Sequence, residues 1–275
     1  MTAPSSRPAY LDSLVLAGSG IRSTDDLDIQ VWELTVPTDV TVLREWADRF
    51  REAYCSDSEI DALRAGTGKS RSEYLTDLVF PNASQGLGPA VRAGDFTELL
   101  LSDFLENEYG LWVPREKYAG KPIPDASIQG VDVIGFRWVA PGRWQDEDVL
   151  VVCEVKAGLS GTRYSGQLQN AITDSAKDYL RVGFTLNATK RRLLTSGDTA
   201  AAAVVERFQN IADQPYQFKS AAAAVLDDGV FDESEIASSD AAAHNNRDQL
   251  SLMVIRGAGL MTLVHALYRD AADGA

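Results

Sequence analysis

The sequence predicts an α/β fold in which helices flank a central mixed sheet. Strand-like and helix-like segments alternate along its 275 residues, as in sheets covered by helices. Two strand-like segments, residues 130–140 and 149–158, are joined by a short charged turn. Pro and Gly residues break the chain near residues 81–89, and the chain is longer than the roughly 150 residues expected of one domain. We therefore divide it into an N-terminal α/β lobe, residues 1–90, and a core with a C-terminal α/β extension, residues 91–275.

The first elements follow from hydrophobic spacing. Residues 29–36 resemble a strand, and residues 40–54 carry apolar side chains at helical intervals. After the Pro- and Gly-rich break, we expect a helix that begins near Asp95 and ends at Gly110. The two strand-like segments at residues 130–140 and 149–158 come next.

The remaining segments continue the alternation. We expect, in order, a helix from Tyr164 to Arg181, a strand near residues 182–187, an alanine-rich helix around 199–212, a loop or short helix in the acidic stretch 227–240, a strand at 251–257 and a helix at 260–271.

Charge and composition limit the class of function. The formal net charge of −14 disfavours unaided binding to nucleic acid, because Lys and Arg drive phosphate binding. The N-terminus lacks the pattern of a signal peptide, and no segment approaches the roughly 20 apolar residues of a membrane span. We therefore expect a cytoplasmic protein without membrane attachment. Cys55 and Cys153 are the only cysteines, which argues against a disulfide framework and a cysteine-rich zinc site.

The strand at residues 149–158 ends in an acid and an amine. Glu154 and Lys156 point to the same side of the strand, because side chains alternate between faces. In an antiparallel hairpin, the positions of opposite residues add to a constant. Asp132 and Glu154 share a midpoint at residue 143, inside the turn. We therefore expect Asp132 to lie opposite Glu154.

Two neighbouring carboxylates repel each other unless a cation or proton intervenes, and they suit Mg²⁺ or Mn²⁺. Such a metal ion polarises a phosphate and lowers the pKa of an attacking water. Lys156 would then stabilise the developing charge. This arrangement favours phosphodiester hydrolysis with Asp132 and Glu154 as metal ligands. In the alternative interpretation, Asp132 is a turn carboxylate and Glu154 forms only an ion pair with Lys156.

Three further polar residues are weaker candidates. Glu98 could supply a third acid and metal ligand from its helix, or it could complete a capping box with Asp95 at the helix start. Asp103 is expected to be solvated. Gln169 could orient Lys156 or a phosphate, or it could be an ordinary polar helix residue.

Two other features are not expected to carry chemistry. GTGKS, residues 66–70, resembles the end of a P-loop, but Leu63 stands where that motif needs Gly. Lys69 is therefore expected in a surface loop rather than on a nucleotide. Cys153 is expected to be a small core residue, and His265, on an apolar helix, is expected to pack rather than to bind a metal.

The sequence resembles the PD-(D/E)xK nuclease superfamily. Gly-x-Asp opens one strand, a turn follows, and an apolar run ends in Glu-x-Lys. Val131 stands where the superfamily usually has Pro. The resemblance implies a restriction-endonuclease-like core, with Asp132 and Glu154 as metal ligands, Lys156 as catalytic amine and Glu98 as the acid from the preceding helix.

Residues 90–185 also resemble the HamA family, the nuclease component of Hachiman antiphage defence. The segments that carry this likeness are, in order, AGDFTELLLSDFLE, GVDVIGF, LVVCEVKAG and AITDSAKDYL. The resemblance implies a metal-dependent DNA nuclease that is held in check by a helicase partner. It also implies that residues 1–90 and the C-terminal third bind that partner.

Two other functions remain open. The chain could be a non-catalytic interaction subunit that keeps the nuclease-like fold, which its acidic composition favours. A regulator that binds ATP through GTGKS is a third and weaker hypothesis.

Overall fold

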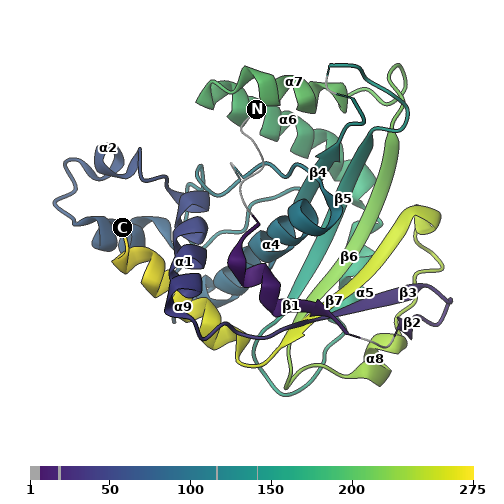
Figure 1. The fold of residues 1–275 in the computed structure, drawn as a ribbon, viewed down its shortest axis with the longest axis horizontal. Coiled ribbons are helices and arrows are strands. Elements are labelled where there is room, and N and C mark those ends of the chain that lie inside the picture. The colour runs from purple at the N-terminus through teal and green to yellow at the C-terminus, as the bar shows by residue number, and fades with distance from the viewer. Residues whose placement is uncertain (1–6, 18–19, 116, 141) are drawn as a thin grey trace.

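The computed structural model describes residues 7–17, 20–115, 117–140 and 142–275. A mixed sheet of seven strands forms its centre, in the order β1-β3-β7-β6-β5-β4, and β2 pairs with β3 (Figure 1). The strands are β1 (Leu14–Leu16), β2 (Ile21–Arg22), β3 (Asp28–Leu34), β4 (Val133–Arg137), β5 (Val149–Gly158), β6 (Gln217–Asp227) and β7 (Leu250–Gly257).

Strands β3, β7, β6 and β5 run parallel to one another. Strand β4 is antiparallel to β5, and β1 and β2 are antiparallel to β3. The predicted α/β fold with a mixed central sheet is therefore confirmed. Because β3 pairs with β7, a strand from residues 1–90 lies in the same sheet as strands from residues 91–275.

Helices cover both faces of the sheet (Figure 1). The longer helices are α1 (Val40–Tyr54), α4 (Gly88–Tyr109), α5 (Gln167–Ser175), α6 (Asp178–Ser196), α7 (Thr199–Arg207) and α9 (Leu260–Asp273). The short helical segments are η1 (Ala9–Ser13), α2 (Ile60–Arg64), α3 (Arg71–Tyr74), η2 (Leu75–Val79), α8 (Glu233–Ala237) and η3 (Arg247–Gln249). Helices α1, α4 and α9 share a core with one face of the sheet, and α5, α6 and α7 cover the other face.

Strand β6 was not predicted, although it lies between β5 and β7 in the sheet. Its sequence QFKSAAAAVLD is rich in alanine, which has the highest helix propensity of any residue. Ala221 and Ala223 face the α1–α4–α9 core, whereas Ala222 and Ala224 face α5. A strand buried on both faces between close helices has room only for small side chains, so packing outweighs propensity here.

Helix α4 begins at Gly88, not near Asp95 as predicted. Pro89 lies in its first turn, where its missing N–H costs no hydrogen bond. At Gly88 a Cβ atom would lie 2.2 Å from the carbonyl oxygen of Asn82, so only glycine fits this close approach. The Pro and Gly residues that predicted a break therefore mark the start of the helix.

The helix predicted from Tyr164 to Arg181 is two helices, α5 and α6, and the strand predicted at residues 182–187 is wrong because these residues lie within α6. Leu186 and Leu193 on α6 are buried against β4, β5 and α7. The Val, Phe and Thr residues that suggested a strand are accommodated in a helix because this packing exceeds their weak β preference. The predicted alanine-rich helix is confirmed as α7, although it ends at Arg207.

No helix in the described ranges combines the length and the apolar character that crossing a membrane requires.

A larger side chain in the middle of β6 should destabilise the fold. Ala223→Leu adds three carbon atoms to a fully packed site, and we expect it to lower the free energy of unfolding by about 1–3 kcal/mol. Ala203→Leu, at an exposed position of α7, is the matched control and should change it by less than about 0.5 kcal/mol. Urea unfolding measures both variants, and equal effects would contradict the packing explanation for β6.

Candidate functional site

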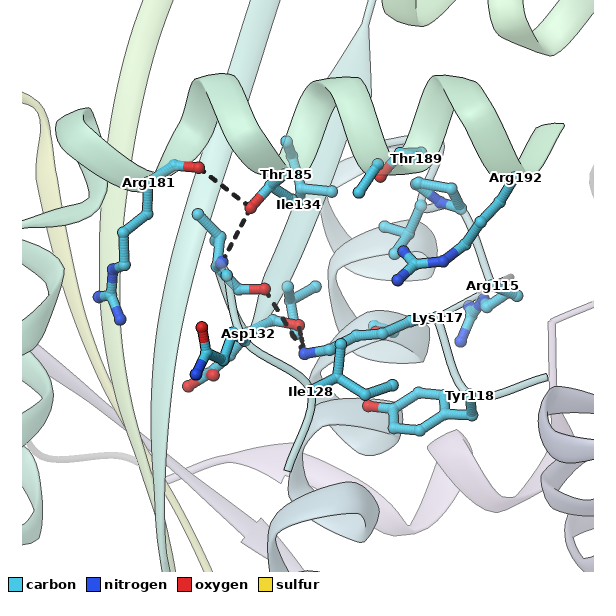
Figure 2. Close-up of a pocket in the computed structure, with 18 of the residues that line it drawn as sticks. Arg115, Lys117, Tyr118, Ile128, Asp132, Ile134, Arg181, Thr185, Thr189 and Arg192 are labelled. Carbon is cyan, nitrogen blue, oxygen red and sulfur yellow. Dashed lines mark hydrogen bonds between the residues drawn. The ribbon is translucent and has the colours of Figure 1, made fainter. Parts of the chain in front are cut away.

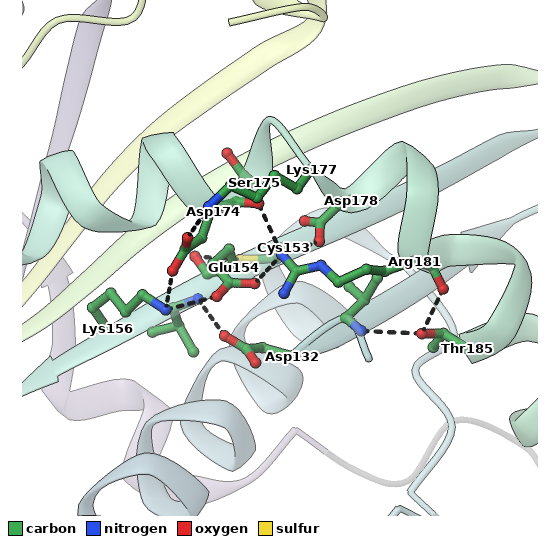
Figure 3. Close-up of polar contacts among 12 residues, drawn as sticks. Asp132, Cys153, Glu154, Lys156, Asp174, Ser175, Lys177, Asp178, Arg181 and Thr185 are labelled. Atoms are coloured by element: carbon green, nitrogen blue, oxygen red, sulfur yellow. Dashed lines mark hydrogen bonds and ion pairs between the residues drawn. The ribbon is translucent and has the colours of Figure 1, made fainter. Parts of the chain in front are cut away.

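The predicted register of the β4–β5 hairpin is confirmed. The pairs run from Val133 opposite Cys153 to Arg137 opposite Val149, so the next position places Asp132 opposite Glu154. The Asp132 Oδ2 atom accepts a hydrogen bond of 3.0 Å from the backbone N–H of Val155. Asp132 is therefore fixed against β5 at the end of the hairpin (Figure 3).

The Glu154 side chain is buried, with 2% of the residue exposed, and two cations compensate its charge. Lys156 Nζ donates to Oε1 at 2.7 Å, and Arg181 Nη2 donates to Oε2 at 3.0 Å. Lys156 comes from the same strand and Arg181 from α6, so Figure 3 shows the carboxylate between two elements. A buried carboxylate is tolerated only when it is paired in this way.

Lys156 is held on its other side by Asp174 of α5, 2.8 Å away. Burial alone would lower the pKa of Lys156, but the hydrogen bonds to Asp174 and Glu154 outweigh it and raise that pKa. The same bond lowers the pKa of Asp174 to about 2, with help from Lys177. Lys156 is therefore a permanent cation near neutral pH, suited to stabilise negative charge and unsuited to act as a base.

Asp178, at the start of α6, is a further acid in this cluster. Its side chain is fully buried, and burial, together with the charges of Glu154 and Asp132, raises its pKa to about 7 although Arg181 opposes the shift. Arg181 Nη2 lies 2.6 Å from Asp178 Oδ1. Within the described part of the chain, however, neither carboxylate oxygen of Asp178 has a hydrogen-bond partner. Asp178 is therefore paired with Arg181 by charge but not by a well-aligned hydrogen bond, and a proton or cation is favoured at this buried carboxylate.

The acids in this cluster raise each other's pKa values. Burial, followed by the charge of Glu98, raises the pKa of Asp132 to about 6. Burial and the charge of Asp132 also raise the pKa of Glu154. A hard divalent cation fits this donor chemistry, since it would relieve the repulsion between Asp132 and Glu154. The described residues contain no group of three or more Asp, Glu, His or Cys side chains arranged to hold a metal ion, and Mg²⁺ or Mn²⁺ stays a prediction.

Glu98 lies in the interior of α4, so the capping-box interpretation is wrong. Its Oε2 atom accepts hydrogen bonds from Lys117 Nζ at 2.5 Å and from the Tyr118 hydroxyl at 2.6 Å. Lys117 also donates to the backbone carbonyl of Asp132 at 2.9 Å. Glu98 is therefore near Asp132 but is occupied by a lysine, and its role as a metal ligand stays a prediction.

Asp103 is buried on α4, which contradicts the expectation that it is solvated. Arg49 Nη2 and Arg115 Nη2 each lie 2.6 Å from its Oδ1 atom, and the Tyr10 hydroxyl donates to Oδ2. These contacts join the N-terminal segment and α1 to α4. Asp103 is therefore a structural acid rather than part of the site.

Among the described residues, the hydrogen bonds of the Gln169 amide go to Thr173 and Asp240 and not to Lys156. Its amide exchanges two backbone hydrogen bonds with Asp240, of 3.1 and 2.7 Å, so it holds the loop after α8 against α5. Lys69 forms an ion pair of 2.6 Å with Asp77, and Ser70 caps α3 with Glu73. The surface-loop interpretation of GTGKS is therefore confirmed.

Sequence reasoning missed four charged residues of this region: Lys117, Asp174, Asp178 and Arg181. The last three recur every three or four residues in the segment that follows the Glu-x-Lys motif, and this helical spacing could have placed them on one face of a helix. No sequence pattern indicated Lys117, because its position depends on how the segment after α4 folds back along that helix.

The raised pKa of Asp132 makes stability depend on pH. A carboxyl group whose folded pKa lies above its unfolded pKa costs stability as the pH rises, here from about pH 4 to about pH 7. Asp132→Asn removes this cost and keeps an oxygen for the Val155 N–H. We expect its free energy of unfolding to exceed that of the natural protein by about 1–2 kcal/mol at pH 8 and to differ little at pH 4.5.

Urea unfolding in EDTA at the two pH values measures this difference. The control is Asp248→Asn, at an exposed position of η3, which should be neutral at both. An Asp132→Asn effect of the same size at pH 4.5 and pH 8 would contradict the electrostatic explanation.

Comparison with known proteins places the chain in a family. No curated protein matches it. The HamA family model matches residues 9–271, nearly the whole chain, whereas the resemblance read from the sequence covered only residues 90–185. HamA is the component of Hachiman antiphage defence that gives the family its name. The chain belongs to the HamA family and is thus a component of this defence system.

Proposed function

We propose that this protein is a metal-dependent DNA nuclease with a restriction-endonuclease-like core, acting as an effector of Hachiman defence. The observation that carries the proposal is the register of the β4–β5 hairpin, which sets Asp132 opposite Glu154, with Lys156 on the same face. Two acids and an amine at the end of one hairpin are the groups that metal-assisted phosphodiester hydrolysis needs.

Each residue has a distinct role in this proposal. Asp132 and Glu154 would hold Mg²⁺ or Mn²⁺, which when bound supplies a polarised phosphate and a water of lowered pKa. Lys156 would stabilise the charge that develops on the phosphate, and Asp174 fixes the position of its amine at 2.8 Å. Glu98, near Asp132, is proposed as a third acid.

A second candidate function is a non-catalytic subunit that keeps this fold. The observation that favours it is the pairing of Glu154, because both carboxylate oxygens already contact a cation. A purely structural ion pair would have this geometry. The two functions differ in whether the site binds a divalent cation.

Substitutions in the hairpin should separate metal binding from catalysis. We expect Glu154→Gln to lose both Mn²⁺ binding and DNA cleavage, because it removes a charged ligand. Lys156→Ala should keep or strengthen Mn²⁺ binding, since it leaves the acids less compensated. It should nevertheless lower the cleavage rate by about 10²-fold or more.

Isothermal titration with Mn²⁺ measures metal binding, and cleavage of plasmid DNA in the presence of the helicase partner measures catalysis. Lys69→Ala, whose lysine pairs with Asp77 on the surface, is the control and should match the natural protein in both. If Mn²⁺ binds neither the natural protein nor Lys156→Ala, the metal-dependent mechanism is excluded and the subunit function is favoured.

We also propose that a helicase partner holds the nuclease silent until the helicase engages DNA. A chain of net charge −14 repels DNA as a whole, so a partner that binds DNA would supply the missing attraction. The complex should bury at least about 1,000 Å². Co-purification and a plasmid-cleavage assay with and without the helicase test this. Rapid cleavage by the isolated protein, unchanged when the helicase is added, would contradict it.

A further inference from the structure

A pocket of about 550 Å³ opens beside the candidate site, between α6 and the segment that leads from Val113 to Ile134. Asp132 is part of its wall, so the pocket and the acid cluster share a residue. Figure 2 shows α6 along one side, with Lys117 and Tyr118 on the other. A molecule in this pocket would therefore lie next to Asp132, one of the carboxylates proposed to hold the metal.

The charge of the pocket is opposite to that of the protein. Arg115, Lys117, Arg181 and Arg192 line it, whereas Asp132 is the acidic side chain in the wall that the structure describes. Three of the four cations are paired with acids of α4, β5 or α6. In the described ranges, no hydrogen bond or ion pair joins the Arg192 guanidinium to another residue. This guanidinium is available to an anion.

The helical period of α6 sets the geometry of this wall. One face of the helix carries Arg181, Thr185 and Arg192, because the first two are four residues apart and the last two are seven apart, which is about two turns. Figure 2 shows Arg192 and Thr185 over the same space. Phe184 also lines the pocket, yet its side chain is 80% exposed. Phe184 and Arg192 are about two helical turns apart on α6 and line the same pocket. An aromatic ring left in water can stack on a base.

We propose that this pocket binds one nucleotide of single-stranded DNA next to the cleavage site, with its phosphate on Arg192 and its base on Phe184. The choice of DNA rests on the proposed nuclease function. A free phosphate contact and an aromatic platform are the two parts of a single-strand binding site. A volume of about 550 Å³ suits one unpaired nucleotide, as in other small-ligand pockets of roughly 300–1,000 Å³. A base within a duplex is stacked and paired, and its face could not meet Phe184.

The test measures binding without cleavage. Fluorescence anisotropy with a labelled single-stranded oligonucleotide in EDTA, at several salt concentrations, gives the affinity and its salt dependence. Arg192→Ala should weaken binding and reduce the slope of log affinity against log salt by about 0.7, the value for one phosphate contact to a single strand. Arg192→Lys should keep the slope.

Phe184→Ala should weaken binding about tenfold without changing the salt slope, because stacking involves no counterion release. Phe184→Trp should preserve the affinity. The matched controls are Arg191→Ala and Tyr179→Ala, which change an arginine and an exposed tyrosine of α6 outside the pocket. Both controls should bind as the natural protein does.

Three outcomes would overturn the proposal. In the first, the protein binds no oligonucleotide at any salt concentration. In the second, the pocket variants and the controls lose the same affinity. In the third, duplex and single strand bind with equal affinity and Phe184→Ala has no effect. Plasmid cleavage in Mn²⁺ is measured separately. If the protein cleaves plasmid DNA but the pocket variants bind the oligonucleotide normally, the nuclease function is supported and the pocket proposal is wrong. If binding depends on the pocket but no cleavage is seen, the pocket proposal is supported and the nuclease function is wrong.

Discussion

The burial of the Glu154 carboxylate is the constraint on which the rest of the site depends. Moving a carboxylate out of water costs several kcal/mol unless cations and hydrogen bonds replace the water. Here Lys156 and Arg181 do so, at 2.7 and 3.0 Å. Arg181 belongs to α6, and Lys156 is tied to α5 through Asp174. The charge of Glu154 therefore holds both α5 and α6 against this end of β5. The polar side chains of the site are positioned by these ion pairs before any ligand binds.

A second set of ion pairs determines the opposite wall. The segment after α4 folds back along that helix, and its cations meet the acids of α4 in reverse order. Arg115 pairs with Asp103, Lys117 with Glu98 and Lys121 with Asp95, at 2.5–2.6 Å. Because these acids are largely buried, the segment cannot move away without leaving charges unpaired. This pairing places Lys117 between Glu98 and the Asp132 backbone, and it also forms the basic side of the pocket.

Local geometry in the hairpin was predictable from the sequence, whereas the surroundings of the hairpin were not. The midpoint at residue 143 matched the observed register, although residues 138–148 connect the two strands, because the apolar alternation of each strand fixes which residues face the core. Strand β6 was not predicted, because the alanines that fit between two layers of helices also favour a helix. The capping motif at Asp95 and Glu98 was also misleading, because a short local pattern fits more than one structure. The same acids, Asp95 and Glu98, instead pair with Lys121 and Lys117, which lie 26 and 19 residues further along the chain. Short sequence patterns do not report such contacts.

The distribution of charge is compatible with the proposal that a chain of net charge −14 acts on a polyanion. Exposed charges separated by more than about 8–10 Å are largely screened at physiological salt. A phosphate in the pocket would therefore respond mainly to Arg192 and its cationic neighbours, and little to distant acids on the surface. Away from the pocket, the excess of acidic residues in the chain opposes close, nonspecific contact with DNA. If the pocket binds a strand as proposed, a chain of this net charge would engage DNA where a strand is delivered to the basic pocket, so that delivery, rather than affinity, would select the target.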